Sequence, residues 1–159
     1  MSKSYGTNIK RSTDHNGVCC FRSKLESDWA YWLDFQLKHK LILNWEYEPE
    51  FYEFPKYKHG TTRYLPDFRI TELDGSITIH ETKGVVRGKD ITKIRRIKQE
   101  FPELKYWLIF QKHDTRSKSK SMRHRINLIT PVINLIDRLV SASDECFCTM
   151  PKQRRNRKV

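Results

Sequence analysis

The stretch RYLPDFRITELDGSITIHETKG, residues 63–84, decides the fold of this 159-residue chain. Two runs of β-forming residues flank the turn signal LDG at residues 73–75, which predicts a β-hairpin. A three-residue loop built on a type I turn is a common hairpin connection, and it needs glycine in the left-handed region where Gly75 stands. This loop pairs Asp67 with Glu81, whereas a two-residue loop shifts the partner of Asp67 by one residue. The position of Gly75 favours the three-residue loop.

Two carboxylates and an amine meet on one face of the hairpin in this register. Glu81 and Lys83 are two residues apart, so a strand places both side chains on the face that Asp67 shares. Like charges directly opposite each other destabilise a strand pair. A divalent cation reverses that effect, because Mg²⁺ takes carboxylate oxygens as ligands. Lys83 adds a cation that can orient a water, lower its pKa or contact a scissile phosphate. The pattern favours metal-assisted phosphodiester hydrolysis over a surface charge ladder.

Composition narrows the classes of partner. The formal net charge is +12 and hydrophobic residues make up 37% of the chain. Such a charge predicts a polyanionic partner, and no basic amphipathic helix favours a membrane, so we expect nucleic acid. The sequence has no apolar run of about 18 residues and no apolar signal region at its start, so we expect a cytoplasmic protein of a bacterial or phage-infected cell. The four cysteines lack C-x-x-C spacing and are expected to be reduced thiols.

Hydrophobic periodicity predicts a mixed α/β core. Apolar residues at helical spacing predict one helix over residues 23–40 and a second over residues 90–101, which Pro102 ends. An aromatic strand region at residues 44–54, interrupted by Pro49, precedes the hairpin, and a buried strand follows at residues 104–111. The order is therefore α-β-β-β-α-β, a mixed sheet flanked by helices, with a right-handed parallel crossover around the second helix.

The remaining sequence divides the chain into segments. We expect a flexible basic N-terminal segment at residues 1–20, the core at residues 21–111, a basic loop or linker at residues 112–126, a short apolar C-terminal helix within residues 127–145, and a basic tail at residues 146–159. Thr130 and Pro131 resemble an N-cap and a first helical residue.

Three motifs carry a resemblance to a known family. They are FRSKLE at residues 21–26, YLPDF at residues 64–68 and ETKG at residues 81–84. In this order they resemble the endonuclease I family of phage Holliday-junction resolvases, within the PD-(D/E)xK, restriction-endonuclease-like nucleases. The resemblance implies that fold, Mg²⁺-dependent DNA cleavage in which Mn²⁺ can substitute, and products with 5′-phosphates. It also implies a homodimer in which the N-terminal helix is exchanged between subunits.

Glu26 has two interpretations. Ser23 and Glu26 fit the capping box, in which both side chains satisfy backbone donors at the start of a helix. The resemblance implies that Glu26 completes a metal site with Asp67 and Glu81, and that Lys83 is the catalytic lysine. One side chain can serve in both roles at different times.

Other polar and aromatic residues are assigned by their positions. His80 points away from Glu81 and is expected to pack against the sheet. Four tryptophans fall on predicted buried faces and are expected in the core: Trp29, Trp32, Trp45 and Trp107. Basic residues near the predicted site are candidate phosphate contacts: Arg22, Arg87, Lys89, Lys93, Arg95, Arg96 and Lys98.

The leading hypothesis is a Mg²⁺-dependent DNA endonuclease, selective for branched DNA such as four-way junctions. One alternative is a site- or end-specific nuclease, such as a transposase subunit, that docks a partner protein through the C-terminal helix. The other is a noncatalytic nucleic-acid-binding protein. The intact Asp67, Glu81 and Lys83 speak against this last alternative.

Overall fold

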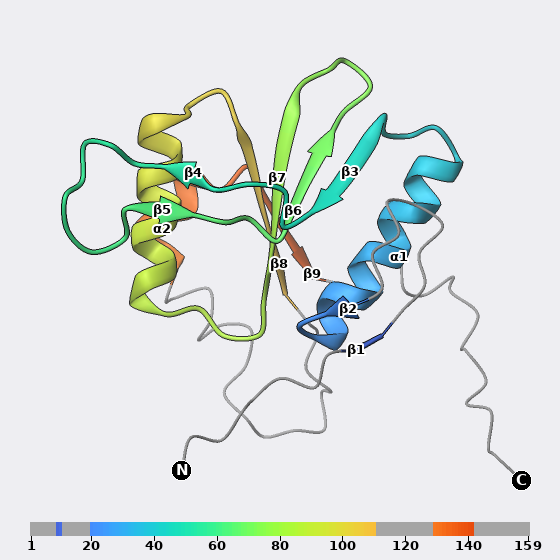
Figure 1. Cartoon of the computed structure of the whole chain (residues 1–159), viewed down its shortest axis with the longest axis horizontal. Helices are drawn as coiled ribbons and strands as arrows, with labels where there is room; N and C mark the ends of the chain where they lie inside the picture. The colour runs from blue at the N-terminus through green and yellow to red at the C-terminus, as the bar shows by residue number, and fades with distance from the viewer. Residues whose placement is uncertain (1–8, 11–19, 111–128, 142–159) are drawn as a thin grey trace, which may run out of the picture.

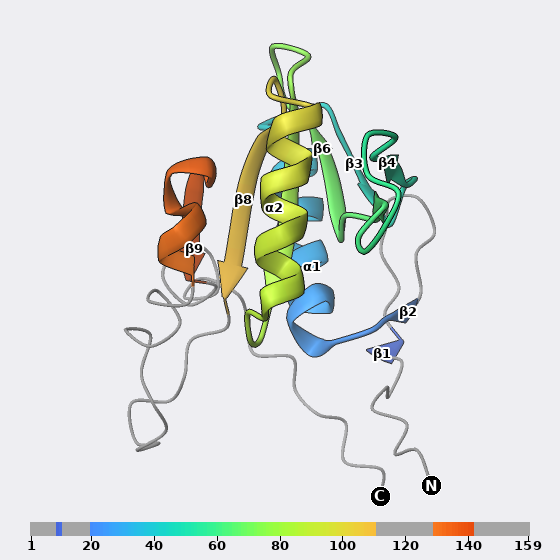
Figure 2. The same cartoon turned by 90° about the vertical axis from the view of Figure 1, so that its left-hand side faces the viewer.

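The structure, a computed structural model, describes residues 9–10, 20–110 and 129–141. Its centre is a five-stranded sheet, flanked by α1 (Lys24–Lys38) on one face and by α2 (Gly88–Glu100) with the 3₁₀ helix η1 (Thr130–Leu135) on the other (Figures 1 and 2). The strands lie in the order β3 (Asn44–Tyr47), β6 (Phe68–Thr71), β7 (Ile77–Lys83), β8 (Lys105–Phe110) and β9 (Arg138–Ser141). The first three are antiparallel and the last three are parallel.

The chain order of these elements confirms the expected fold. α1, β3, β6, β7, α2 and β8 follow one another as α-β-β-β-α-β, the predicted order of a mixed sheet flanked by helices. β7 and β8 are parallel neighbours joined through α2, as the predicted crossover requires. Both helices begin at the edge of the sheet where β6 starts and β7 ends (Figures 1 and 2). That edge therefore collects the beginnings of two helices and the predicted carboxylates.

The hairpin register is the one predicted from Gly75. Phe68 pairs with His80 and Thr71 with Ile77, so the same ladder places Asp67 opposite Glu81. The connection is the expected three-residue loop at residues 73–75, closed by bonds from the Glu72 amide to the Ser76 carbonyl and from the Gly75 amide to the Glu72 carbonyl, at 2.9 and 3.0 Å. Gly75 has φ +80°, in the left-handed region that its lack of a Cβ allows.

The first helix begins where the capping box predicts. Ser23 is its N-cap, and the Ser23 hydroxyl accepts a hydrogen bond from the Glu26 amide at 3.1 Å. The helix ends two residues before the predicted limit, in a Schellman arrangement: the Leu41 amide donates to the Gln36 carbonyl and the Lys40 amide to the Leu37 carbonyl. Lys40 takes the left-handed conformation, with φ +57°. No glycine marks this ending, which is why the sequence pattern overran it.

Two apolar clusters, one on each face, hold the layers together. The α1 side contains Trp29 and Trp45, both fully buried, with Trp32 and Trp107 packed against them, so the prediction of four core tryptophans is confirmed. The α2 side is built by residues of β7, β8, α2 and η1, including Ile79, Ile94, Ile97, Leu108, Ile129 and Val132. Both faces of β7 are therefore covered.

The predicted C-terminal helix is wrong in type and extent. Residues 130–135 form a 3₁₀ helix, and residues 138–141 form β9, a fifth strand parallel to β8. Val132 and Val140 are buried in the core. Pro131 does start the helical turn, but the β-branched residues after it favour an extended chain. This segment completes the sheet rather than forming a separate helix.

Two other segments differ from the expectation. Residues 63–64 form β5, which pairs with β4 (Tyr52–Glu53) instead of extending the hairpin strand. Near the N-terminus, β1 (Ile9–Lys10) pairs with β2 (Cys20–Phe21), although residues 1–20 showed no pattern of regular structure. Two-residue ladders depend on backbone hydrogen bonds and leave too short a side-chain pattern to be recognised.

Several predictions lie outside the described residues. They concern the basic loop at residues 112–126, the basic tail at residues 146–159, and three cysteines, Cys19, Cys146 and Cys148. Among the described residues, no helix is long and apolar enough to span a membrane.

His80 packs in the core, as predicted, on the face opposite Glu81. It is 2% exposed, accepts a hydrogen bond from the Trp29 indole at 3.2 Å, and stacks on Trp107. Burial disfavours the imidazolium and, with the charge of Arg138, lowers the pKa of His80 to about 3. The neutral ring is thus the folded form.

We predict that the His80→Gln variant loses less stability on acidification than the wild type. An unfolded histidine binds a proton below about pH 6.5 that folded His80 rejects, so His80 costs stability as the pH falls from about 6.5 towards 3. Between about pH 7 and pH 5, the free energy of unfolding measured with urea should fall by about 2 kcal/mol more in the wild type than in the variant. Equal losses in both proteins would contradict the assignment.

Candidate active site

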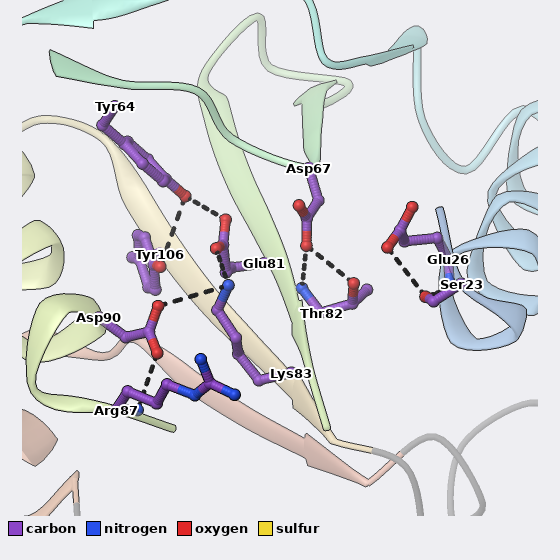
Figure 3. A network of polar contacts seen from close by, with 10 residues as sticks. All are labelled: Ser23, Glu26, Tyr64, Asp67, Glu81, Thr82, Lys83, Arg87, Asp90 and Tyr106. Carbon is purple, nitrogen blue, oxygen red and sulfur yellow. Dashed lines mark hydrogen bonds and ion pairs between the residues drawn. The ribbon is translucent and has the colours of Figure 1, made fainter. Parts of the chain in front are cut away.

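Glu81 is the most buried carboxylate of the site. It lies near the end of β7, is 1% exposed, and both of its oxygens have partners. Oε1 lies 2.5 Å from the Lys83 ammonium, and Oε2 accepts a hydrogen bond from the Tyr64 hydroxyl at 2.6 Å (Figure 3). Burial and the charge of Glu81 raise the pKa of Tyr64, so its phenol remains a donor. The Tyr64 hydroxyl also lies 3.4 Å from the Tyr106 hydroxyl.

Asp67 lies just before β6, opposite Glu81 in the ladder. Its Oδ2 accepts hydrogen bonds from the Thr82 amide at 2.7 Å and the Thr82 hydroxyl at 2.8 Å. Burial and the charge of Glu81 raise the pKa of Asp67 to about 8, against the opposing effects of Lys83 and Thr82. A carboxyl with this pKa favours its protonated form at neutral pH unless a cation neutralises the pair.

Lys83 carries the positive charge of the site. Its ammonium contacts Glu81 and lies 3.5 Å from Asp90 Oδ1. Burial works to lower the pKa of Lys83, but the charges of Glu81 and Asp67 outweigh it and raise the pKa above its usual range. Lys83 is therefore an ammonium donor in this arrangement and not a general base.

Glu26 caps α1, and the structure gives its oxygens three partners. Oε2 accepts from the Arg22 amide at 2.8 Å and from the Tyr47 hydroxyl at 2.6 Å, while Oε1 accepts from the Ser23 hydroxyl at 2.9 Å. Figure 3 shows Glu26 on the far side of Asp67 from Glu81. Ser23 is confirmed as the N-cap, but Glu26 accepts from the amide of Arg22, one residue before the N-cap, and not from the Ser23 amide that a capping box uses. The role of Glu26 as a metal ligand stays a prediction.

The site contains residues that the sequence pattern did not reveal. Tyr64 donates to Glu81, Tyr47 donates to Glu26, and Asp90 contacts Lys83. Glu48 also belongs to the acidic group. Burial and the charges of Glu26 and Glu81 raise the pKa of Glu48, while Arg22 opposes the shift. Glu48 follows β3 with φ +42°, and its amide donates to the Asp67 carbonyl. It stood among other glutamates and gave no distinguishing signal. Tyr64 lies within the YLPDF motif, which could have identified it.

The carboxylates are not gathered into a finished metal centre. In the described part of the chain, no three His, Cys, Asp or Glu side chains stand close enough to hold a metal ion. Asp67 and Glu81 are nonetheless brought together on one edge, and both supply the hard oxygen donors that Mg²⁺ and Mn²⁺ take. Asp67 uses Oδ2 for both of its bonds to Thr82, which leaves Oδ1 for another partner.

The predicted phosphate contacts fall into two groups. Arg87, Lys89 and Arg95 are exposed on α2 or just before it, and the Arg22 side chain is 69% exposed beside Glu48. Lys93 is half-buried and lies over the Tyr64 ring.

Arg96 and Lys98 have internal roles. Arg96 stacks on Tyr57 and donates to the carbonyls of His59 and Thr61. Lys98 is 15% exposed and binds the Leu104 carbonyl and Asp137. These contacts favour structural roles for Arg96 and Lys98. Phosphate binding stays a prediction for the other candidates, which are Arg22, Arg87, Lys89, Lys93 and Arg95.

A family model described as "Protein of unknown function (DUF1064)" matches residues 9–117, more than half of the chain. The chain belongs to this family. The match spans the core from β1 to β8, so all four predicted catalytic residues lie within the DUF1064 region. No curated protein matches the sequence.

Among solved structures, this DUF1064 member is similar to one described as the crystal structure of a repair endonuclease from Pyrococcus abyssi. The two are 14% identical, with a TM-score of 0.34, over 77% of this chain and 50% of that chain. The chain thus spans half the length of that endonuclease. The likeness is too distant to assign an activity.

We predict that Tyr64→Phe destabilises the protein far more than Tyr57→Phe. Tyr64 is buried and donates to a carboxylate, and loss of such a bond costs about 1.5–3 kcal/mol. Tyr57 donates to Gln99 at an exposed position, where the expected loss is about 0.5 kcal/mol or less. Urea unfolding at neutral pH measures both. Equal losses would show that Tyr64 does not support Glu81.

Proposed function

We propose that this protein is a metal-dependent DNA endonuclease that hydrolyses phosphodiester bonds. The observation that carries the proposal is the direct opposition of Asp67 and Glu81 at one edge of the sheet, with Lys83 next on the same face of β7. Opposed carboxylates lower the stability of a strand pair, so folding alone does not favour them. The two carboxylates suit a divalent cation, and the ammonium beside them suits a phosphate.

The residues present fit a divalent cation. Asp67 and Glu81 would hold it, and the resemblance to endonuclease I adds Glu26. When bound, Mg²⁺ or Mn²⁺ supplies a Lewis acid that polarises the phosphate and lowers the pKa of a water. A bound cation would also neutralise the charge of Glu81, which together with burial keeps the pKa of Asp67 high.

The chain's own groups supply positioning and charge. Lys83 stays protonated, so its ammonium can donate to a non-bridging phosphate oxygen and stabilise the charge that develops there. Tyr64 holds Glu81 from the other side, and Thr82 holds Asp67 through two donors. These bonds limit the rotamers of both carboxylates, which lowers the cost of ordering them around a substrate.

DNA is the substrate that the charges favour. The net charge is +12, and exposed Arg22, Arg87 and Lys89 lie near the beginnings of α1 and α2, at the edge that holds the carboxylates. Selectivity for branched DNA and a dimeric state rest on the resemblance to endonuclease I alone. A site-specific nuclease with a partner is less favoured, because the segment expected to dock the partner is part of the sheet and core.

We predict that the wild-type chain with Mg²⁺ makes paired nicks in a labelled four-way junction and leaves a linear duplex of the same arms intact. Lys83→Ala should reduce the rate about a hundredfold or more, because a charged donor to the phosphate is lost. Removing Mg²⁺ with a chelator should abolish cleavage, and Mn²⁺ should restore it.

Lys105→Ala is the matched control. Lys105 is an exposed lysine at the start of β8, paired in register with Thr78 and therefore remote from Lys83, so this variant should cut at the wild-type rate. Cleavage of both substrates would contradict selectivity for junctions while retaining the nuclease. Tight binding without cutting in Mg²⁺ or Mn²⁺ would contradict the enzyme and favour a noncatalytic binder.

A further inference from the structure

Lys83 has a second acidic partner that its motif does not include. Its Nζ lies 2.5 Å from Glu81 Oε1 and 3.5 Å from Asp90 Oδ1. Glu81 belongs to the same strand, β7, whereas Asp90 lies in the first turn of α2. The second contact therefore joins β7 to the helix that follows it (Figure 3). The Lys83 and Asp90 side chains are 19% and 14% exposed, and salt screens such a pair less than a surface pair.

The Asp90 carboxylate is held in a fixed orientation. Its Oδ2 accepts a hydrogen bond from the Arg87 amide at 2.8 Å, and the Asp90 amide donates to the Arg87 carbonyl at 2.9 Å. These bonds cap α2, and a negative charge in the first turn is favourable there. Capping uses only Oδ2. The other oxygen, Oδ1, is left to face Lys83, which capping alone does not require.

We propose that Asp90 is a positioning residue that retains Lys83 at the site when Glu81 is neutralised. The inference rests on the proposed function, in which Glu81 binds a divalent cation. A cation on Glu81 cancels the charge that now holds the ammonium and repels Lys83 directly. Asp90 is then the carboxylate already within reach of Nζ, on a helix that holds it in place.

Asp67 cannot take over this task. Its Oδ2 is bound to Thr82, and it faces Glu81 as the second candidate ligand, so the same cation neutralises it. Asp90 contacts the amine but neither Asp67 nor Glu81. The site thus separates two duties: Asp67 and Glu81 face the cation, while Asp90 balances the charge of Lys83.

The test replaces the cation with a substitution, so that it needs neither metal nor DNA. The full-length Asp67→Asn/Glu81→Gln variant neutralises both candidate ligands, as a bound cation would, and the introduced glutamine can still accept from Tyr64. Asp67 is replaced as well because its charge also acts on Lys83. The ¹³C relaxation order parameter of Lys83 Cε reports how firmly the amine is held. We expect a value close to the wild type in this variant, and a fall to the value of exposed Lys89 when Asp90→Asn is added.

Two variants serve as controls. Asp90→Asn keeps an amide oxygen for the Arg87 bond, so α2 should remain capped. Asp90→Glu in the Asp67→Asn/Glu81→Gln background should keep Lys83 ordered. Asp28→Asn removes the same charge from the exposed Lys24–Asp28 pair of α1 and should leave Lys83 unchanged. A mobile Lys83 in Asp67→Asn/Glu81→Gln, or an ordered one after Asp90→Asn is added, would overturn the proposal.

Cleavage kinetics give a second readout. Asp90→Asn should lower kcat on a cleavable junction about ten- to a hundredfold, as misplaced catalytic groups do, with little change in KM. Asp28→Asn should leave both constants unchanged. A rise in KM with an unchanged kcat would overturn the positioning role. If the wild type cuts no DNA, the proposed function fails, while the relaxation data still decide whether Asp90 holds Lys83.

Discussion

The opposition of Asp67 and Glu81 across the β6–β7 hairpin is the constraint on which the site depends. A single register produces it, and that register follows from a three-residue loop with Gly75 at φ +80°. A slip of one residue would move Asp67 off the face of Glu81 and reverse the inward and outward faces of β6 as well. The apolar residues of the hairpin and its carboxylates therefore specify the same register, so core packing also positions the site.

The rest of the site compensates for that opposition. Glu81 is held between Lys83 and Tyr64, and Asp67 receives two bonds from Thr82. A buried carboxylate without partners costs several kcal/mol, so these donors are what allow the pair to exist in the folded chain. They do not cancel the cost, because burial and the charge of Glu81 still raise the pKa of Asp67 to about 8. This remaining cost of ionising Asp67 is the physical reason to expect a cation there.

Sequence reasoning succeeded where a local rule applied and failed where tertiary contacts decide. Gly75 predicted the register, and the Ser23–Glu26 spacing predicted the cap, because turns and caps obey short-range geometry. The end of α1 was missed because Lys40 takes a conformation usually left to glycine. β9 was read as a helix because its apolar run is short and its partner β8 is distant in sequence. The supporting contacts, such as Asp90 to Lys83, join different elements and leave no periodic signal.

A direct test of the central claim is to locate Mn²⁺ by anomalous scattering in crystals of the full-length protein grown or soaked with the ion. The account predicts a peak between the carboxylates of Asp67 and Glu81, at a distance typical of metal–oxygen bonds, and no such peak in crystals of Asp67→Asn. A well-ordered site with no peak at saturating Mn²⁺, or a peak only at other carboxylates such as Glu46 and Glu50, would contradict it.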